Sequence, residues 1–83
     1  MQLRSEGITW QEIDGELVIL DTARSVYLTT NVAGAKLAKL LTEERSLDEL
    51  TDALVTAYGI TREAAQTDAE AFVADLRDKG LLR

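Results

Sequence analysis

The sequence predicts an α+β fold in which a three-stranded antiparallel sheet is followed by three helices. Strand-like runs with turn signals between them fill residues 8–30. From Asn31 onward, apolar residues recur instead at spacings of three and four, which is typical of amphipathic helices. The 83 residues include no proline and no low-complexity linker, so we expect a single domain over residues 1–83.

Two turn signals divide the predicted sheet into three strands. Apolar and polar residues alternate in residues 8–13, and the Asp14-Gly15 pair that follows is a strong hairpin signal. Residues 16–21 are almost continuously apolar, which indicates a strand covered on both faces. A softer turn then leads into residues 25–30, which are rich in β-branched and aromatic residues. The simplest topology is a meander with the second strand in the centre and the third at an edge.

The third predicted strand has no residue that would protect an exposed edge. Val26 and Leu28 share one of its faces, whereas Tyr27 shares the other with Ser25 and Thr29. Natural edge strands usually carry residues such as Lys, Glu or Pro that discourage further pairing, and this stretch has none of them. Two interpretations stay open: the strand simply closes the sheet, or its edge accepts an extended peptide.

Each predicted helix begins at a residue suited to capping. Asn31 is a good N-cap for a short first helix. Ser46 begins the second helix, and Glu49 three residues later completes a capping box. Thr61 begins the third helix, which runs to Gly80. The last residues then pack back as a short extended tail.

The third helix carries two neighbouring stripes of different character. Asp68, Phe72, Asp75 and Lys79 recur at helical spacing and mix one aromatic ring with carboxylates, which suits the rim of a groove. The alternative is that the carboxylates are solvated surface and Phe72 is ordinary core. A metal site would need more oxygen ligands than this stripe supplies. The second stripe is expected in the core and contains Ala69, Val73, Leu76 and Gly80.

The composition excludes several kinds of chemistry. The chain has no cysteine and no histidine, so it lacks thiolate nucleophiles, Cys-based metal sites and the commonest general base. We therefore expect neither an enzyme nor a cofactor. No apolar run is long enough for a signal peptide or a membrane span, so the expected compartment is the cytoplasm.

Charge argues against nucleic acid as a partner. Fifteen acidic and nine basic residues give a net charge of −6, whereas nucleic-acid binding depends on Lys and Arg at phosphates. Residues 32–58 could form a helix-turn-helix, and three strands with three helices suggest a winged helix. The surface that would read DNA, however, carries Asp48, Glu49 and Asp52. A third interpretation is a protein-interaction domain that uses Trp10 or the acidic second helix.

Motifs along almost the whole chain resemble, in order, the PqqD-like family, the recognition elements of ribosomally synthesised and modified peptides. Each motif is weak alone, and the ordered set is fairly specific. Thr30 departs from the pattern, because the family usually has Leu before the Asn. The matching stretches are Gly15 through Asp21, Tyr27 through Asn31, Gly34-Ala35, Ser46-Leu47-Asp48-Glu49-Leu50, Tyr58-Gly59, Asp68, Phe72, Leu76 and Gly80-Leu81-Leu82.

This resemblance implies a winged-helix-like fold and a non-catalytic function, the recognition of the leader segment of a precursor peptide. The leader would add as a strand beside the third strand and lie against the last helix. No catalytic and no metal-binding residue is implied. The implied peptide-binding residues are Ser25, Val26, Tyr27, Leu28, Thr29, Asp68, Ala69, Phe72, Asp75 and Leu76.

The partners implied by the resemblance depend on the biosynthetic system. A leader-binding domain without a fused enzyme resembles the discrete recognition protein of a split lasso-peptide system. Such a protein presents the precursor to a separate leader peptidase and then to a cyclase. The alternative resembles PqqD itself, a peptide chaperone that serves a radical enzyme.

Overall fold

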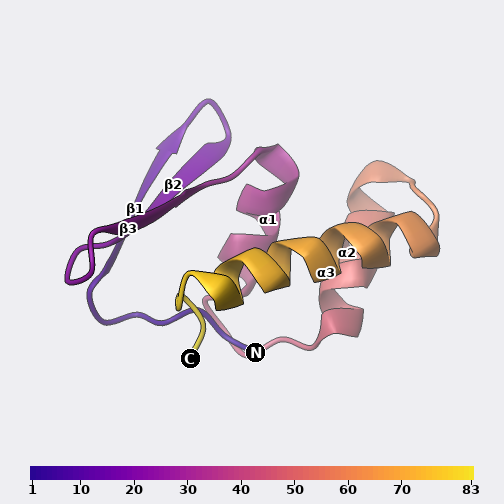
Figure 1. Ribbon diagram of the computed structural model, residues 1–83. Coiled ribbons are helices and arrows are strands. Elements are labelled where there is room, and N and C mark those ends of the chain that lie inside the picture. Colours follow the sequence, from indigo (N-terminus) through magenta and orange to yellow (C-terminus); the bar gives the residue numbers. More distant parts are fainter.

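The computed structural model describes residues 1–83 and confirms the expected α+β fold (Figure 1). A three-stranded antiparallel sheet in the order β1-β2-β3 is followed by three helices, so the meander is also confirmed. β2 lies in the centre, and β3 forms one edge of the sheet. The elements are β1 (Ile8–Ile13), β2 (Glu16–Asp21), β3 (Val26–Thr29), α1 (Val32–Leu40), α2 (Leu47–Tyr58) and α3 (Arg62–Asp78).

The register separates the sheet into an inner face and an outer face. Trp10, Ile19 and Leu28 are direct partners across the three strands, and all three pack in or against the core. Leu20 and Tyr27 are partners on the opposite face, where they are 37% and 64% exposed. The expectation that residues 16–21 are covered on both sides is therefore wrong, because the helices cover only the inner face. Trp10 and Tyr27 lie on different faces and form no common patch.

Both turns of the sheet depend on residues with positive φ. Asp14 and Gly15 have φ values of 53° and 82°, as a tight hairpin turn requires. In the second turn, Asp21 Oδ1 accepts hydrogen bonds from the N–H groups two and three residues further on. Ser25 closes this turn with a φ of 54°. The third strand is consequently shorter than expected and begins at Val26, because Ser25 does not have extended backbone.

Thr30 anchors the end of β3 to β2, although the family pattern favours Leu at this position. Its N–H donates to the Leu17 carbonyl at 2.8 Å, and its Oγ1 accepts from the Leu17 N–H at 3.1 Å. Thr30 is buried at 5% exposure. Its hydroxyl therefore satisfies a buried backbone N–H that an aliphatic side chain would leave unpaired.

The helix boundaries follow the local capping chemistry predicted from the sequence. Asn31 Oδ1 accepts from the Gly34 N–H at 2.8 Å, and Thr61 Oγ1 accepts from the N–H three residues on. Ser46 and Glu49 form the reciprocal capping box. Each cap satisfies N–H groups that have no partner within the helix.

The core lies between the inner face of the sheet and the three helices. The N-terminal segment enters this layer, where the Leu3 N–H donates to the Leu41 carbonyl and Leu3 forms an isolated bridge with Leu82. The expected extended tail is thus confirmed. None of the helices combines the length and apolar character that a membrane crossing requires. The buried apolar residues are Leu3, Leu17, Ile19, Ala35, Leu37, Ala38, Leu41, Leu50, Leu54, Ala65, Ala69, Val73, Leu76 and Leu81.

Candidate functional site

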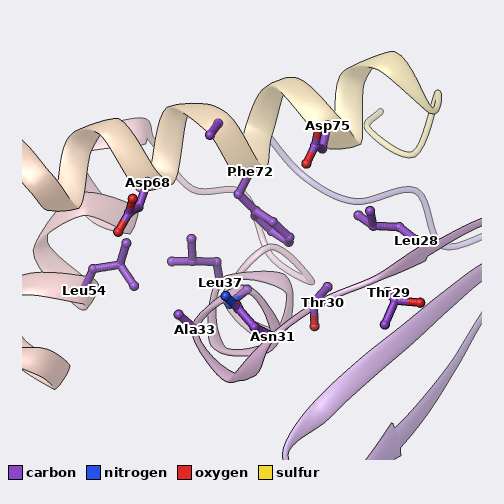
Figure 2. Close-up of a pocket in the computed structure, with 12 residues that line it drawn as sticks. Leu28, Thr29, Thr30, Asn31, Ala33, Leu37, Leu54, Asp68, Phe72 and Asp75 are labelled. Atoms are coloured by element: carbon purple, nitrogen blue, oxygen red, sulfur yellow. The ribbon is translucent and has the colours of Figure 1, made fainter.

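A groove of about 310 Å³ lies where β3 passes into α1, and α3 forms its opposite wall (Figure 2). Its wall residues come from four elements and from the short connection between β3 and α1. The groove is thus built by the tertiary fold rather than by one local motif. Its lining residues are Leu28, Thr29, Thr30, Asn31, Ala33, Gly34, Leu37, Leu54, Asp68, Ala71, Phe72 and Asp75.

Aliphatic side chains from three elements give the groove an apolar floor. Leu28 comes from the inner face of β3 and is half-buried. Leu37 of α1 and Leu54 of α2 are almost completely buried, with 2% and 1% exposure. An apolar side chain placed over this floor would lose contact with water on several sides, which favours binding.

Phe72 reaches from α3 into the groove toward the first turn of α1 (Figure 2). The ring is half-buried and packs against the core. Gly34 makes this approach possible, because a Cβ at that position would lie 3.2 Å from Phe72 Cε1 and 3.0 Å from Thr30 Cβ. Phe72 therefore serves both as the edge of the core and as a wall of the groove.

Two carboxylates flank Phe72 along α3. Asp68 lies one turn before it and Asp75 one turn after it, so they are separated by about 10 Å along the helix axis. Both residues are exposed, and neither takes part in any of the eight ion pairs of the chain. No Lys or Arg lines the groove. The groove thus combines an apolar floor with two acidic groups that have no cationic partner.

The free edge of β3 runs beside this groove. β3 pairs only with β2, so one side of its backbone has no strand partner. Because the Thr30 N–H points to Leu17 of β2, the alternation of an antiparallel ladder directs the N–H groups of Tyr27 and Thr29 away from β2. A further strand could therefore pair with Tyr27 and Thr29 while its side chains reach the groove.

The structure brings together half of the residues that the sequence suggested as a peptide-binding set. Leu28, Thr29, Asp68, Phe72 and Asp75 line the groove. The other five do not: Ala69 and Leu76 lie in the core with 0% exposure, the Tyr27 side chain points to the outer face, and Ser25 and Val26, at the start of β3, do not line the groove.

Seven lining residues were missed by sequence reasoning. Ala71 had a usable signal, since it lies three residues after Asp68 and four before Asp75 on the same side of α3. The connection between β3 and α1 also had a usable sequence signal, because a helix cap that directly follows an edge strand must lie at the end of that edge. The positions missed are Thr30, Asn31, Ala33, Gly34, Leu37, Leu54 and Ala71.

The fold and the groove define a small α+β domain with an open strand edge beside a helical wall, and the sequence assigns this domain to a family. Residues 16–82 match the family described as coenzyme PQQ synthesis protein D (PqqD). The chain therefore belongs to the PqqD family. No curated protein matches the chain.

Two solved structures share the fold over nearly their entire length. One is TbiB1 in complex with the TbiA(beta) leader peptide, with 28% identity, a TM-score of 0.86 and coverage of 100% of this chain and 95% of that one. The other is lasso peptide synthetase B1 complexed with the leader peptide, with 26% identity, a TM-score of 0.80 and coverage of 96% and 93%. Both similar proteins were thus solved with a leader peptide.

Proposed function

We propose that this protein binds the leader segment of a ribosomally synthesised precursor peptide by strand addition at β3. The observation that carries the proposal is that the unpaired edge of β3 runs beside the groove walled by α3. Backbone pairing at the edge would supply affinity, and the groove would supply selectivity. The two similar structures, both complexes with a leader peptide, support this function.

Alternation of side chains determines how such a leader would sit. In a strand added to β3, every second side chain points to the inner face and the others to the outer face. The inward side chains would meet Leu28 and Phe72, with Asp68 and Asp75 near the two ends of the groove. Tyr27 and Thr29 would contribute their outward-directed backbone groups, while Ala69 and Leu76 would support the helical wall from the core.

In this proposal the protein is a non-catalytic recognition module, and residues 1–83 act as one unit. It presents the bound precursor to a separate leader peptidase and to a cyclase in lasso-peptide maturation. The lasso peptide synthetase B1 match supports this system. The family description supports the second candidate, a PqqD-type peptide chaperone that serves a radical enzyme.

An NMR titration with a synthetic leader peptide tests the function. We expect chemical-shift changes along residues 25–31 and along the groove side of α3, with changes at the Tyr27 and Thr29 amides that report strand pairing. Amides at the far end of α2 serve as the internal control. Saturable binding elsewhere, or no binding at all, would refute the proposal. Incubating the protein and its bound precursor with a lasso-type peptidase or with a radical enzyme then distinguishes the two systems by which enzyme processes the precursor.

A further inference from the structure

Arg24 carries a guanidinium group that donates no hydrogen bond within the protein. Its single ion pair is with Asp21 Oδ2, at 3.9 Å. The Asp21 carboxylate already accepts hydrogen bonds from Arg4 Nη1 and from two backbone N–H groups of the β2–β3 turn. Two guanidinium groups thus share one buried carboxylate, so this cluster has an uncompensated positive charge. The Arg24 side chain is 52% exposed, which leaves its N–H donors open to a ligand.

The fold places this guanidinium where the end of α3 meets the start of β3. Arg24 comes two residues before Val26, the first residue of β3. Its side chain lies against Gly80, because a Cβ added to Gly80 would collide with the guanidinium group. Gly80 follows directly after the C-cap of α3. The guanidinium group therefore lies on the helical side of the sheet, the side on which the groove opens.

The sign of the charge changes along the space between β3 and α3. Asp68 lies toward the Leu54 end of the groove, and Asp75 lies toward the Leu28 end (Figure 2). β3 and α3 run in opposite directions here, so the end of α3 and Arg24 lie beyond Leu28. A strand that pairs along the whole of β3 would pass the two carboxylates at one end and the guanidinium group at the other.

An antiparallel leader strand would encounter the acidic end of this space first. Both strand pairs of the sheet are antiparallel, and antiparallel pairing is slightly more stable per residue than parallel pairing. The leader side chain opposite Leu28 would point inward, because directly opposite residues share a face. The residue two positions later would lie opposite Val26 and close to Arg24, at about 3.4 Å per residue. The residue two positions earlier would lie about 7 Å closer to Asp68.

We infer that the leader is charge-ordered and that Arg24 binds its acidic part. In this order a Lys or Arg precedes the apolar anchor that faces Leu28, and an Asp or Glu follows the anchor by two to four residues. The inference rests on the proposed function and names the class of leader that the site selects. The basic residue would pair with Asp68 or Asp75, and the guanidinium group of Arg24 would donate to the leader carboxylate. A leader with the opposite order would place like charges together at both ends.

Leader peptides of equal composition separate charge order from net charge. The probes are three fluorescein-labelled synthetic leaders, and an alanine scan identifies the anchor. The first is the natural leader, the second has Gln in place of the acidic residues that follow the anchor, and in the third the basic and acidic residues that flank the anchor exchange places. Fluorescence anisotropy measures the affinity of each leader.

Two arginine variants of the protein test the role of Arg24. Arg24→Gln removes the guanidinium group beside β3. Arg77→Gln is the matched control, because Arg77 is exposed and lies two residues after Asp75, about 200° around α3. Thermal unfolding confirms that both variants are folded. The charge-exchanged leader is tested on the unchanged protein, so this comparison needs no variant.

We expect the charge-exchanged leader to bind the unchanged protein at least about fivefold more weakly than the natural leader, at identical net charge. Arg24→Gln should weaken binding of the natural leader about two- to fivefold, as the loss of an exposed ion pair does. The same variant should bind the Gln-containing leader as the unchanged protein does. Arg77→Gln should match the unchanged protein with all three leaders.

Equal or tighter binding of the charge-exchanged leader would overturn the inference alone, as would a natural leader with no acidic residue after its anchor. Equal losses for the natural and the Gln-containing leader in Arg24→Gln would also overturn it, because Arg24 would then act only through the turn that Asp21 organises. Failure of the natural leader to bind the unchanged protein would refute the proposed function as well.

Discussion

Arg4 donates a hydrogen bond from Nη1 to Asp21 Oδ2 at 3.1 Å, and the Asp21 side chain is fully buried. The same Arg4 nitrogen donates to the Gly80 carbonyl at 2.8 Å. The other oxygen of Asp21 accepts from the N–H groups of Ala23 and Arg24, both at 3.2 Å. Asp21 thus fixes the β2–β3 turn directly and, through Arg4, connects this turn to the N-terminal segment and to the residues that follow α3. β3 and α3 are two of the elements that form the groove.

The Asp21→Asn variant should be less stable than the unchanged protein near neutral pH. Burial by itself raises the pKa of Asp21, but hydrogen bonds from the Arg24 N–H and the Arg4 guanidinium outweigh it and lower the pKa below its ordinary 3.8. A lowered pKa in the folded state stabilises the fold above the ordinary pKa, and this stabilisation is lost as the pH falls through the folded-state value.

Urea unfolding over a range of acidic and neutral pH measures this contribution. We expect the stability difference between Asp21→Asn and the unchanged protein to be largest at neutral pH and to shrink as the pH falls below 3.8. Glu6→Gln makes the same change of charge at an exposed carboxylate of the N-terminal segment and should have little effect. A difference for Asp21→Asn that persists at the lowest pH would contradict the ionic role of this residue.

Local chemistry was enough to predict the elements, because each signal acts within a few residues. The Asp14-Gly15 turn and the caps at Asn31, Ser46 and Thr61 all involve bonds over at most three residues. The sequence predicts the start of β3 one residue early, because the backbone of Ser25 is set by a turn that the Asp21 side chain organises. That constraint depends on burial of Asp21, which periodicity does not reveal.

The groove was only partly predictable, because its walls converge from distant parts of the chain. The Asp68, Phe72 and Asp75 stripe was predictable from helical spacing on a single element. Leu37 and Leu54 reach the groove only because α1 packs beside α2 and α2 packs against α3, so nothing local marks them as floor residues.

Replacing Gly34 by Ala should displace the Phe72 ring and weaken leader binding several-fold. The added Cβ would lie 3.2 Å from Phe72 Cε1 and 3.0 Å from Thr30 Cβ, which is too close for both neighbours to stay in place. Overpacking of this kind costs roughly 1–3 kcal/mol of stability. In a Phe72→Leu background the same change should cost less, because the obstructing ring is gone. Denaturant unfolding and fluorescence anisotropy of the unchanged protein, the two single variants and the double variant complete this double-mutant cycle. If the effects of the two substitutions on stability and on binding are strictly additive, the Gly34–Phe72 contact is refuted as the cause.

The Phe72→Ala variant should weaken leader binding by roughly 1–3 kcal/mol, because a ring that lines a desolvated pocket acts as an anchor. Calorimetry with the synthetic leader measures the loss, and circular dichroism confirms that the variant is folded. Since Phe72 also packs against the core, some loss of stability is expected. Tyr58→Ala, which removes an exposed aromatic ring outside the groove, is the control and should bind normally. Equal affinity for Phe72→Ala and Tyr58→Ala would remove Phe72 from the binding surface.

The groove should prefer leaders with a cationic side chain near the apolar anchor, because Asp68 and Asp75 have no cationic partner within the protein. Asp68→Asn and Asp75→Asn should each weaken binding of such a leader by about 0.2–1 kcal/mol, the range for exposed ion pairs. Asp48→Asn, an equal charge change on α2, should have a smaller effect on leader binding, because Asp48 lies outside the groove and its carboxylate pairs with Arg62 at 3.4 Å.

Salt and peptide charge distinguish direct pairing at the groove from the general effect of the negative net charge. Raising the ionic strength should weaken binding to the unchanged protein, and this dependence should become shallower in the Asp68→Asn/Asp75→Asn double variant. A leader whose Lys or Arg residues are replaced by Gln should bind the unchanged protein and the double variant equally well. If the double variant and Asp48→Asn show the same salt dependence, the two carboxylates act only through net charge, and the selectivity of the groove is apolar.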